Sequence, residues 1–489
     1  MKRRGTVLLA VMLVTALSAM VAASLLYYVQ SQVSAAAAGS NGEQAYAAAM
    51  SGLERALAVL RTPDEDWQDN PEMFQNQLVC DDGVNKWYFT VHAPGEDGKT
   101  LRYGLEDESG KINLNFCPEA TLRALLAARK TSDVDTNELA DCLLDYLDRD
   151  NNPRPQGAEQ DYYDKLANPY AIKNGSLGTL EELLLVKGFT GSVVYGNDAN
   201  LNGLVEPNEQ DGDETFPPDA GDGQLDRGLL GVATAVTHEP NVDNASKPRV
   251  NINGAEADLR KLDGLGLPKK TVDFIRSYRQ DNPSKPFTHP SQLLGMSYTT
   301  RQVSPANQPS PPSGRGRRGG GSSPPAANPA APQVVTITSG VTAETLPIVM
   351  DKLTTAAPGP KGQLQGLVNV NTAPVEVLRL LPGMDENLSR TIVETRGALD
   401  AEKKKTVAWL VTENLLDPAK FKVIAPMLTT RSLQLRLHCT GFGVPCGRFR
   451  EVEAVVDFAG TSPRIAYLRD ITRLGPPMAL NVDQQEHRQ

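Results

Sequence analysis

The sequence predicts an α+β protein in which a long amino-terminal helix is followed by an antiparallel sheet, and a large helical insertion interrupts that sheet. Three observations support this prediction. An uncharged apolar run near the amino terminus leads into a helical stripe, strand-like segments occur near both ends of the chain, and a repeated helix-forming pattern fills the middle. The length of 489 residues is sufficient for several domains.

The amino terminus combines a short cationic segment with an apolar run. Lys2, Arg3 and Arg4 precede Gly5, and residues 6–28 contain no charged residue. As a helix, this run would rise about 34 Å at about 1.5 Å per residue, which spans the hydrocarbon core of a membrane. The cationic cluster should remain cytoplasmic, which places the rest of the chain on the other side. The alternative is a signal peptide cut near residues 35–38, which the length of the apolar run disfavours.

The helix is expected to continue past the membrane. After a polar patch at residues 41–44, apolar residues recur at helical spacing. This stripe consists of Tyr46, Ala47, Met50, Leu53, Leu57 and Leu60.

Strand patterns occur in two separate parts of the chain. Residues 86–91 and 100–105 alternate, are rich in aromatic residues, and predict a hairpin. Residues 432–439, 449–458 and 464–471 predict three closing strands that rejoin this hairpin.

An internal repeat lies between these strands. The pattern Asn-apolar-Asn occurs at residues 110–115, 249–253 and 366–371. The second and third copies precede helix pairs, predicted at 256–266 with 269–278 and at 374–383 with 387–396, each joined by a glycine turn. These pairs resemble SAM-like or helix-hairpin-helix repeats.

A helix-hairpin-helix turn can present backbone amides to a DNA phosphate. That interpretation would make the chain a DNA receptor. The net charge of -10 and a pI near 5.2 oppose it, and Asp385 would face the phosphate after Gly383 in the last copy. We therefore expect the helix pairs to serve packing, and no nucleic acid to be bound.

Residues 198–209 read D-A-N-L-N-G-L-V-E-P-N-E and match a calcium-loop pattern at every defined position. Ca²⁺ takes several oxygen ligands, and Gly203 permits the turn between them. The predicted ligands are Asp198, Asn200, Asn202, the carbonyl of Leu204, Glu206 and Glu209. The alternative is a solvated turn without an ion. A second ion could lie among Asp211, Asp213, Asp219, Asp222 and Asp226.

The five cysteines form no CxxC pair and lack zinc-site spacing. Cys439 and Cys446 flank a Gly/Pro segment between two strand-like runs. A disulfide and two free thiols both remain open for this pair. No Ser/His/Asp set, phosphate loop or cofactor fingerprint occurs, so the sequence predicts no enzyme.

Four segments carry a resemblance to a known family. The leader K-R-R-G followed by T-V-L-L-A resembles a type IV prepilin leader. The runs E-S-G-K-I-N-L-N, D-Y-L-D-R-D-N-N-P-R-P-Q-G-A-E-Q-D-Y-Y and T-L-E-E-L-L-L-V-K-G occur in the order found in the K-type minor pseudopilins of type II secretion. The chain therefore resembles the general secretion pathway protein K family, over most of residues 1–300 and 364–470.

The resemblance implies several properties. Prepilin peptidase would cut between Gly5 and Thr6 and methylate the new amino terminus. The fifth mature position is Ala10, whereas most pilins carry glutamate there, and K-type subunits characteristically lack that glutamate. It also implies a pilin-like fold, calcium in the helical domain, and other minor pseudopilins as partners.

The expected function is that of a minor pseudopilin at the tip of the pseudopilus, single-pass in the inner membrane with its soluble part in the periplasm. The alternative is a membrane-anchored DNA receptor of a competence-type uptake system. The expected divisions are a leader at 1–5, the membrane half of the helix at 6–28, its soluble half with the first strands at 29–107, a helical insertion at 108–300, a disordered linker at 301–334, a second helical unit at 335–430, closing strands at 431–475 and a tail at 476–489.

Overall fold

The computed structural model describes residues 3–62, 66–95, 98–129, 135–212, 214, 216, 218–302, 333–356, 362–460 and 462–480, without the side chains of residues 3–6, 301, 302 and 333. The chain divides into two compact units. The first comprises residues 1–237 together with 432–489, and the second comprises residues 238–431. Most of the predicted linker, residues 303–332, lies outside the described residues. Its two margins belong to strands.

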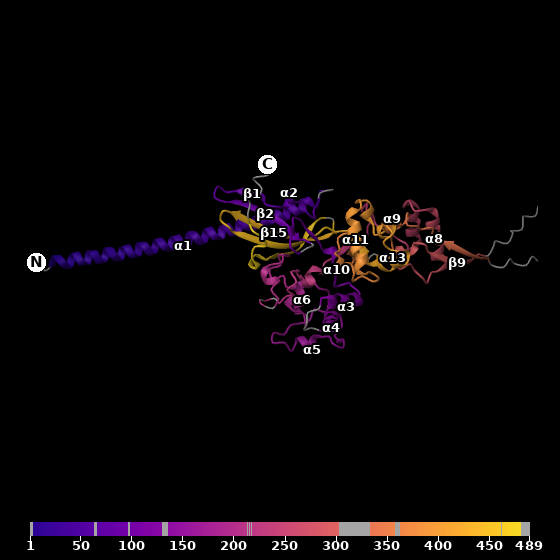
Figure 1. Ribbon diagram of the computed structural model, residues 1–489, viewed down its shortest axis with the longest axis horizontal. Coiled ribbons are helices and arrows are strands. Elements are labelled where there is room, and N and C mark those ends of the chain that lie inside the picture. Colours follow the sequence, from indigo (N-terminus) through magenta and orange to yellow (C-terminus); the bar gives the residue numbers. More distant parts are fainter. Residues whose placement is uncertain are drawn as a thin grey trace, which may run out of the picture. The chain divides into compact units, whose positions relative to one another are not determined.

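One continuous helix begins the first unit. Helix α1 runs from Arg3 to Val59, as the apolar run and the stripe predicted. Figure 1 shows its amino-terminal part extending beyond the sheet. The large apolar side chains of this part, between Val7 and Val33, are exposed. From Ala45 onward one face of the helix is buried.

The buried face of α1 differs from the predicted stripe. Leu53 and Leu57 are buried as expected, but Tyr46 and Ala47 face outward. The contact face also uses the small residues Ala45, Ala48, Ala49, Gly52 and Ala56. Small side chains let a helix approach a sheet closely. Close packing therefore determined which residues of α1 form the buried face more than the size of the apolar side chains did.

The sheet in the first unit is antiparallel and combines strands from both ends of the chain, in the order β1-β2-β15-β16-β17, with β3 paired to β2 and β4 to β15. The strands are β1 (Gln77–Asp81), β2 (Lys86–Pro94), β3 (Leu101–Arg102), β4 (Glu106–Asp107), β15 (Gln434–Val444), β16 (Phe449–Asp457) and β17 (Arg464–Asp470). The predicted hairpin and closing strands are confirmed, and β15 pairs directly with β2. Strand β1, which lacks a clear alternation, was not predicted. Short helices α2 (Pro71–Phe74), η1 (Glu108–Gly110) and η9 (Thr472–Leu474) flank the sheet.

The two faces of the sheet differ in polarity. One face packs against α1 through residues such as Phe89, Val91, Leu437 and Val452. Alternate positions of the same strands carry buried polar residues, which are Thr90, His92, Arg436, His438, Thr440, Glu451 and Glu453. Because side chains alternate along a strand, these residues share the other face.

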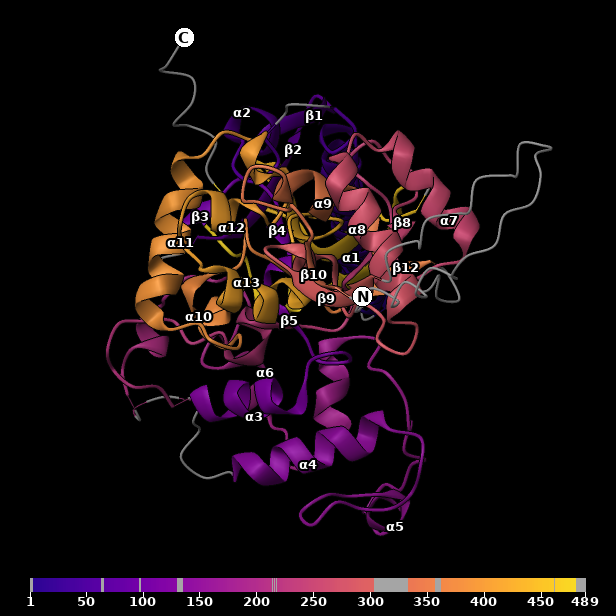
Figure 2. The same cartoon turned by 90° about the vertical axis from the view of Figure 1, so that its right-hand side faces the viewer.

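The insertion begins after β4, and its first part belongs to the first unit (Figure 2). Its elements are β5 (Ile112–Asn113), α3 (Glu119–Ala128), α4 (Thr136–Leu147), α5 (Gln160–Tyr163), η2 (Leu180–Leu185), α6 (Gly191–Tyr195), η3 (Pro207–Glu209), η4 (Gly228–Gly231) and β6 (Ala233–Thr234).

The second unit contains most of the repeated helical sequence. Its helices are α7 (Glu256–Arg260), η5 (Lys261–Gly264), α8 (Lys269–Asp281), η6 (Pro290–Leu293), α9 (Leu346–Lys352), α10 (Val375–Leu378), α11 (Glu386–Ala398), η7 (Lys403–Lys405), α12 (Trp409–Thr412), α13 (Pro418–Ile424) and η8 (Ala425–Met427). Its strands are β7 (His238–Pro240), β8 (Val250–Asn251), β9 (Ser297–Gln302), β10 (Gln333–Thr338), β11 (Leu353–Thr354), β12 (Gln363–Gln365), β13 (Val368–Asn369) and β14 (Leu428–Thr429).

The three Asn-apolar-Asn segments adopt the same local structure. Each forms a two-residue parallel pair with a later segment, in which Asn113, Asn251 and Asn369 lie opposite Thr234, Thr354 and Thr429. The side chain of that asparagine accepts a hydrogen bond from the backbone amide two residues later in all three copies. The second asparagine then holds a distant loop: Asn253 donates to the Phe287 carbonyl and accepts from the Phe287 amide. The internal repeat is therefore structural as well as sequential.

Candidate calcium loop and membrane anchor

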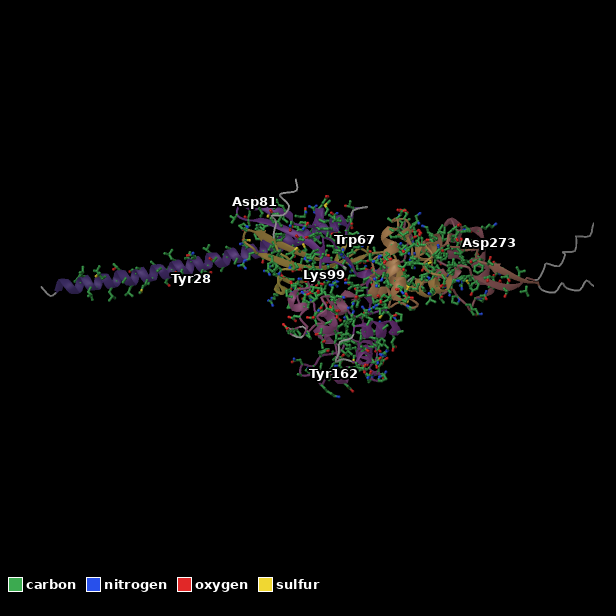
Figure 3. The ribbon with its side chains drawn as sticks, viewed as in Figure 1. Tyr28, Trp67, Asp81, Lys99, Tyr162 and Asp273 are labelled. Atoms are coloured by element: carbon green, nitrogen blue, oxygen red, sulfur yellow. The ribbon has the colours of Figure 1, made fainter. Side chains whose placement is uncertain are left out.

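The predicted processing residues lie at the start of α1. Gly5 and Thr6 fall within this helix, and the side chain of Thr6 lies outside the described part of the chain. From Val7 onward this helix contains an 18-residue stretch of mean hydropathy 2.4. The residues of that stretch are not buried. Tyr28, labelled in Figure 3, lies on this exposed part. By length and composition the helix can cross a membrane.

The predicted calcium loop lies between α6 and η3 and is closed by its last residue. The side chain of Glu209 is buried, with one carboxylate oxygen accepting from the amide of Ala199 at 3.0 Å and the other from the amide of Glu206 at 3.1 Å. Asn197, just before the loop, donates to the Glu209 carbonyl at 3.0 Å. Glu209 therefore joins the two ends of the loop.

The middle of the loop is held by the other predicted ligands. Asn200 accepts from the amide of Asn202, and Asn202 accepts from the amide of Leu204 at 2.8 Å. Both asparagines donate to the two carboxylate oxygens of Glu206, at 3.1 and 3.2 Å. Gly203 has φ +72°, the left-handed conformation that glycine adopts without strain. The structure thus brings all six predicted ligand residues into one turn.

Asp198 supplies an oxygen that the protein leaves unpaired. Its Oδ2 accepts from the amide of Gly203 at 3.1 Å, whereas its Oδ1 is buried without a hydrogen-bond partner in the described part of the chain. Burial raises the pKa of Asp198, against the opposing fields of Arg227 and His438, and burial likewise raises the pKa of Glu209. Buried carboxylates normally have partners, so this orphan oxygen in an oxygen-rich loop fits a calcium ligand.

The loop packs on the end of strand β2. The amide of Val205 donates to the Gly98 carbonyl at 2.8 Å. A Cβ at Gly203 would lie 2.4 Å from the ring of Pro94, so only glycine fits there. Arg227, which faces Asp198, also donates to Glu106 on β4 at 3.2 Å. Sequence reasoning missed Pro94, Arg227 and His438, because their sequence positions are far from the loop.

The downstream acidic residues that the structure describes make turn contacts and one ion pair. Asp219 accepts from the amides of Asp211, Gly212 and Gly221, as a turn residue does. Asp222 accepts from Gln224, and Asp226 pairs with Arg129 at 2.8 Å. Asp213 lies outside the described residues. The possible second ion at this place remains a prediction.

Of the two alternatives left open for Cys439 and Cys446, the structure has two free thiols. Cys439 is buried in β15 and donates to the carbonyl of Ala49 in α1. Cys446 lies in the turn after β15, where its Sγ contacts the carbonyl of Gly443. Cys439 and Gly443 are four positions apart along the strand, which corresponds to about 13 Å at about 3.3 Å per residue. A disulfide requires Cα atoms within about 7 Å.

The two glycine turns predicted between helices are present. Gly266 precedes α8 with φ +75°, and Gly383 precedes α11 with φ +76°. The Asp385 side chain caps α11 by accepting from the amide of Leu388 at 2.8 Å. The Leu388 amide therefore already donates to this carboxylate, whereas a bound phosphate would need such an amide as its own donor.

The fold and the anchor define a class of protein: a helix-anchored α+β subunit in which one helix of membrane-spanning length packs at its far end on an antiparallel sheet, as in the pilin-like proteins. Residues 107–195 match the family model for type II secretion system (T2SS), protein K. This match agrees with the resemblance seen in the sequence.

Individual relatives agree with this assignment. The type II secretion system protein K of Pseudomonas aeruginosa (strain PAO1) is 32% identical over 197 residues, covering 38% of this chain and 57% of that protein. A protein K of Escherichia coli (strain K12) is 27% identical over 205 residues, covering 39% of this chain and 60% of that protein. The matches thus span less than two thirds of each relative.

A solved structure also aligns with the chain. It is a chain from the GspK-GspI-GspJ complex of the enterotoxigenic Escherichia coli type 2 secretion system, matched over 90% of this chain and 98% of that chain with 12% identity and a TM-score of 0.31. Because this TM-score is below 0.5, no conclusion about this chain rests on it.

Proposed function

We propose that this chain is a minor pseudopilin of type II secretion, located at the tip of the pseudopilus. One observation carries the proposal: the segment that matches protein K begins at the end of β4 and lies within the insertion between β4 and β15, two strands that pair in the sheet beside α1. The names of the two relatives support the same role. The role is that of a structural subunit and not of an enzyme.

The position at the tip follows from two features. Ala10 stands where most pilins carry glutamate, so this helix lacks the carboxylate that pairs with a neighbouring subunit's amino terminus. A carboxylate within the membrane is costly unless it is paired, so a subunit without one is suited to begin a filament. The insertion also adds bulk that a repeating subunit would have to accommodate. We propose that α1 crosses the inner membrane once, with the body of the chain in the periplasm.

Other minor pseudopilins are the proposed partners, and prepilin peptidase is the proposed processing enzyme. Copurification of the full chain, in detergent, with the other minor pseudopilins of its own system tests the first. Recovery of the chain alone under conditions that retain the other subunits' mutual contacts would contradict it.

Mass spectrometry of the amino terminus, on protein from native membranes, tests the class of protein. A chain that starts at Thr6 with a methylated amine is the expected result. An intact Met1, or a cut near Ala38, would overturn the proposal.

Calcium bound in the loop of residues 198–209 is part of the proposal. The orphan Oδ1 of Asp198 supports it, and so does the set of amide and carboxylate oxygens around it. When bound, the ion would supply positive charge to Asp198, Glu206 and Glu209 and hold the loop against Pro94 and Gly98. The helix pairs around Gly266 and Gly383 are proposed to be helix-hairpin-helix-like packing modules. The cap made by Asp385 disfavours DNA binding at the second of these turns.

A further inference from the structure

A second group of carboxylates lies in the insertion, apart from the predicted calcium loop. Asp148, Asp150 and Glu159 each direct a carboxylate oxygen to one place, and these oxygens lie within 4.8 Å of one another. They come from the end of α4, the following loop and the residue before α5. The helices that carry them are visible in Figure 2.

Glu159 is the unusual member of this group. Its side chain is 5% exposed, and neither of its carboxylate oxygens has a hydrogen-bond partner among the described residues. Leaving a buried charged group without a partner is costly, so such a group in a folded protein calls for an explanation. Oδ1 of Asp148 is likewise buried and without a partner.

The local charges do not balance. Asp145, Asp148, Asp150 and Glu159 are close enough to affect one another, whereas Arg154 is the cation that pairs with this group, at 2.7 Å from both Asp145 and Asp148. Asp148 caps the carboxyl end of α4, where the helix dipole favours a positive ion. Burial, with Asp145, Asp148 and Asp150, raises the pKa of Glu159 to about 7. A bound cation would offset the excess negative charge, interact favourably with the helix dipole and oppose the rise in the pKa of Glu159.

The group of Asp148, Asp150 and Glu159 is also accessible to a ligand. A pocket of about 430 Å³ adjoins the group, lined by residues that include Asn151, Pro153, Glu159, Tyr162 and Lys165. Tyr162, labelled near the lower edge of the molecule in Figure 3, is 37% exposed. An ion can therefore enter from solvent.

We propose that Asp148, Asp150 and Glu159 bind a calcium ion at the edge of this pocket. Oxygens that share one Ca²⁺ are at most about 4.6–5.2 Å apart, because each lies about 2.3–2.6 Å from the ion. The three carboxylate oxygens lie within 4.8 Å of one another and meet this requirement. Asn174 donates to the carbonyl of Asp150 at 2.8 Å and also leaves its own Oδ1 buried without a partner, so it supports the loop that bears Asp150. This site is independent of the loop at residues 198–209 and of the role in secretion.

Counting bound calcium on the full chain in detergent micelles, by equilibrium dialysis or native mass spectrometry, tests the proposal. Glu159→Gln and Asp150→Asn should each bind one ion fewer than the unmodified chain. Asp161→Asn is the matched control, because Asp161 lines the same pocket but does not belong to the group. Asp198→Asn tests the loop at residues 198–209 separately. The calcium lost in this variant should add to the calcium lost in Glu159→Gln. Equal ion counts for Glu159→Gln, Asp150→Asn and the unmodified chain would overturn the proposal.

Thermal unfolding separates a metal ligand from a structural carboxylate. In chelator, Glu159→Gln should unfold at the same or a higher temperature than the unmodified chain, because the amide removes a buried unpaired charge. In excess calcium the order should reverse, because only the unmodified chain gains the ion. A variant that is less stable by the same amount in both solutions would show that Glu159 is structural and would contradict the proposal.

Discussion

The amide of Gly203 donates to Oδ2 of Asp198 at 3.1 Å, while Oδ1 of the same carboxylate is buried and has no hydrogen-bond partner among the residues that the structure describes. The turn thus fixes the carboxylate and leaves one oxygen available. Because the side chain is held by its other oxygen, an ion that binds Oδ1 would meet a preorganised ligand.

The double variant Asp198→Asn, Glu209→Gln should lose part of the calcium-dependent stability. It should also lose some stability in chelator, because a glutamine at position 209 keeps only one of the two oxygens that accept from the amides of Ala199 and Glu206. Binding to the folded state alone adds about 2.7 kcal/mol to the free energy of unfolding when calcium is about 100 times the dissociation constant. Circular dichroism melts of the full chain, with calcium and with chelator, measure the difference. Glu214→Gln, an exposed change just after the loop, is the control. An equal calcium-induced rise in both proteins would rule out an ion in this loop.

The buried ion pairs beside the sheet predict sensitivity to acid. Burial alone would raise the pKa of Glu108, but Arg436 at 2.8 Å and Lys111 at 3.1 Å lower it from 4.5 to about 2. A depressed pKa adds stability that is fully present above the unfolded value and is lost as the pH falls from about 4.5 toward 2. Denaturant unfolding at a series of pH values measures this loss.

Glu108→Gln should flatten that part of the pH profile and lower the stability at neutral pH, since Arg436 and Lys111 would lose a charged partner. Glu119→Gln, which alters an exposed pair with Arg123, should change the profile little. An unchanged acid limb in Glu108→Gln would show that other carboxylates control it.

The sequence predicted the long helix and the pairing of early and late strands because these depend on local periodicity. The face of α1 could not be predicted with the same success. Its contact surface is made by glycine and alanine, which carry little periodic signal, and it is specified by Cys439 and Phe89 in strands far along the sequence. The state of Cys439 and Cys446 could not be decided from the sequence for a related reason. Spacing in sequence suggested proximity, but the strand continues through Gly443 and carries Cys446 away from Cys439.

The two candidate sites also differ in how far the sequence could predict them. The loop at residues 198–209 is contiguous, so the pattern of its residue types revealed it. The group of Asp148, Asp150 and Glu159 was missed, although Asp-x-Asp after a helix was a visible signal. Its third member is nine residues further along and becomes a ligand candidate only because the intervening loop returns and buries it.

The close approach of α1 to the sheet predicts that Gly52→Ala is destabilising. A Cβ at Gly52 would lie 2.3 Å from Sγ of Cys439 and 2.8 Å from the ring of Phe89. Overpacking of this kind typically costs about 1–3 kcal/mol. Gly39→Ala is the matched control in the same helix, because nothing lies within 4 Å of its Cβ, and it should stabilise the helix by about 0.5–1 kcal/mol. Denaturant unfolding of the two variants should therefore shift in opposite directions, and a stabilising Gly52→Ala would contradict the observed packing.

The repeated asparagine contacts predict a large effect of Asn115→Ala. Asn115 accepts from the amide of Leu177 at 2.7 Å and donates to the carbonyls of Leu177 and Ala235, both at 3.0 Å. Losing these bonds should cost about 2–3 kcal/mol, because partly buried backbone groups would be left without partners. Hydrogen exchange at the Leu177 amide should become faster in this variant. Asn115→Asp keeps the acceptor but turns an oxygen toward two carbonyls, so it should be at least as destabilising. Unchanged exchange at Leu177 in both variants would show that the loop is held by other contacts.

The free thiols predict a definite order of reactivity. Cys80 is exposed on the edge strand β1, whereas Cys439 is buried between β15 and α1. Burial raises the pKa of Cys439, and the thiolate is the reactive form, so Cys439 should be protected twice over. Maleimide labelling of the native chain should modify Cys80 first and Cys439 only after unfolding, and labelling in denaturant without reductant should reach all five cysteines. Cys80→Ser should remove the fast phase and leave the slow one. If Cys439 and Cys446 reacted in denaturant only after reduction, a disulfide would join them. The turn after β15 would then have to be rebuilt so that Cys446 returns to the middle of the strand.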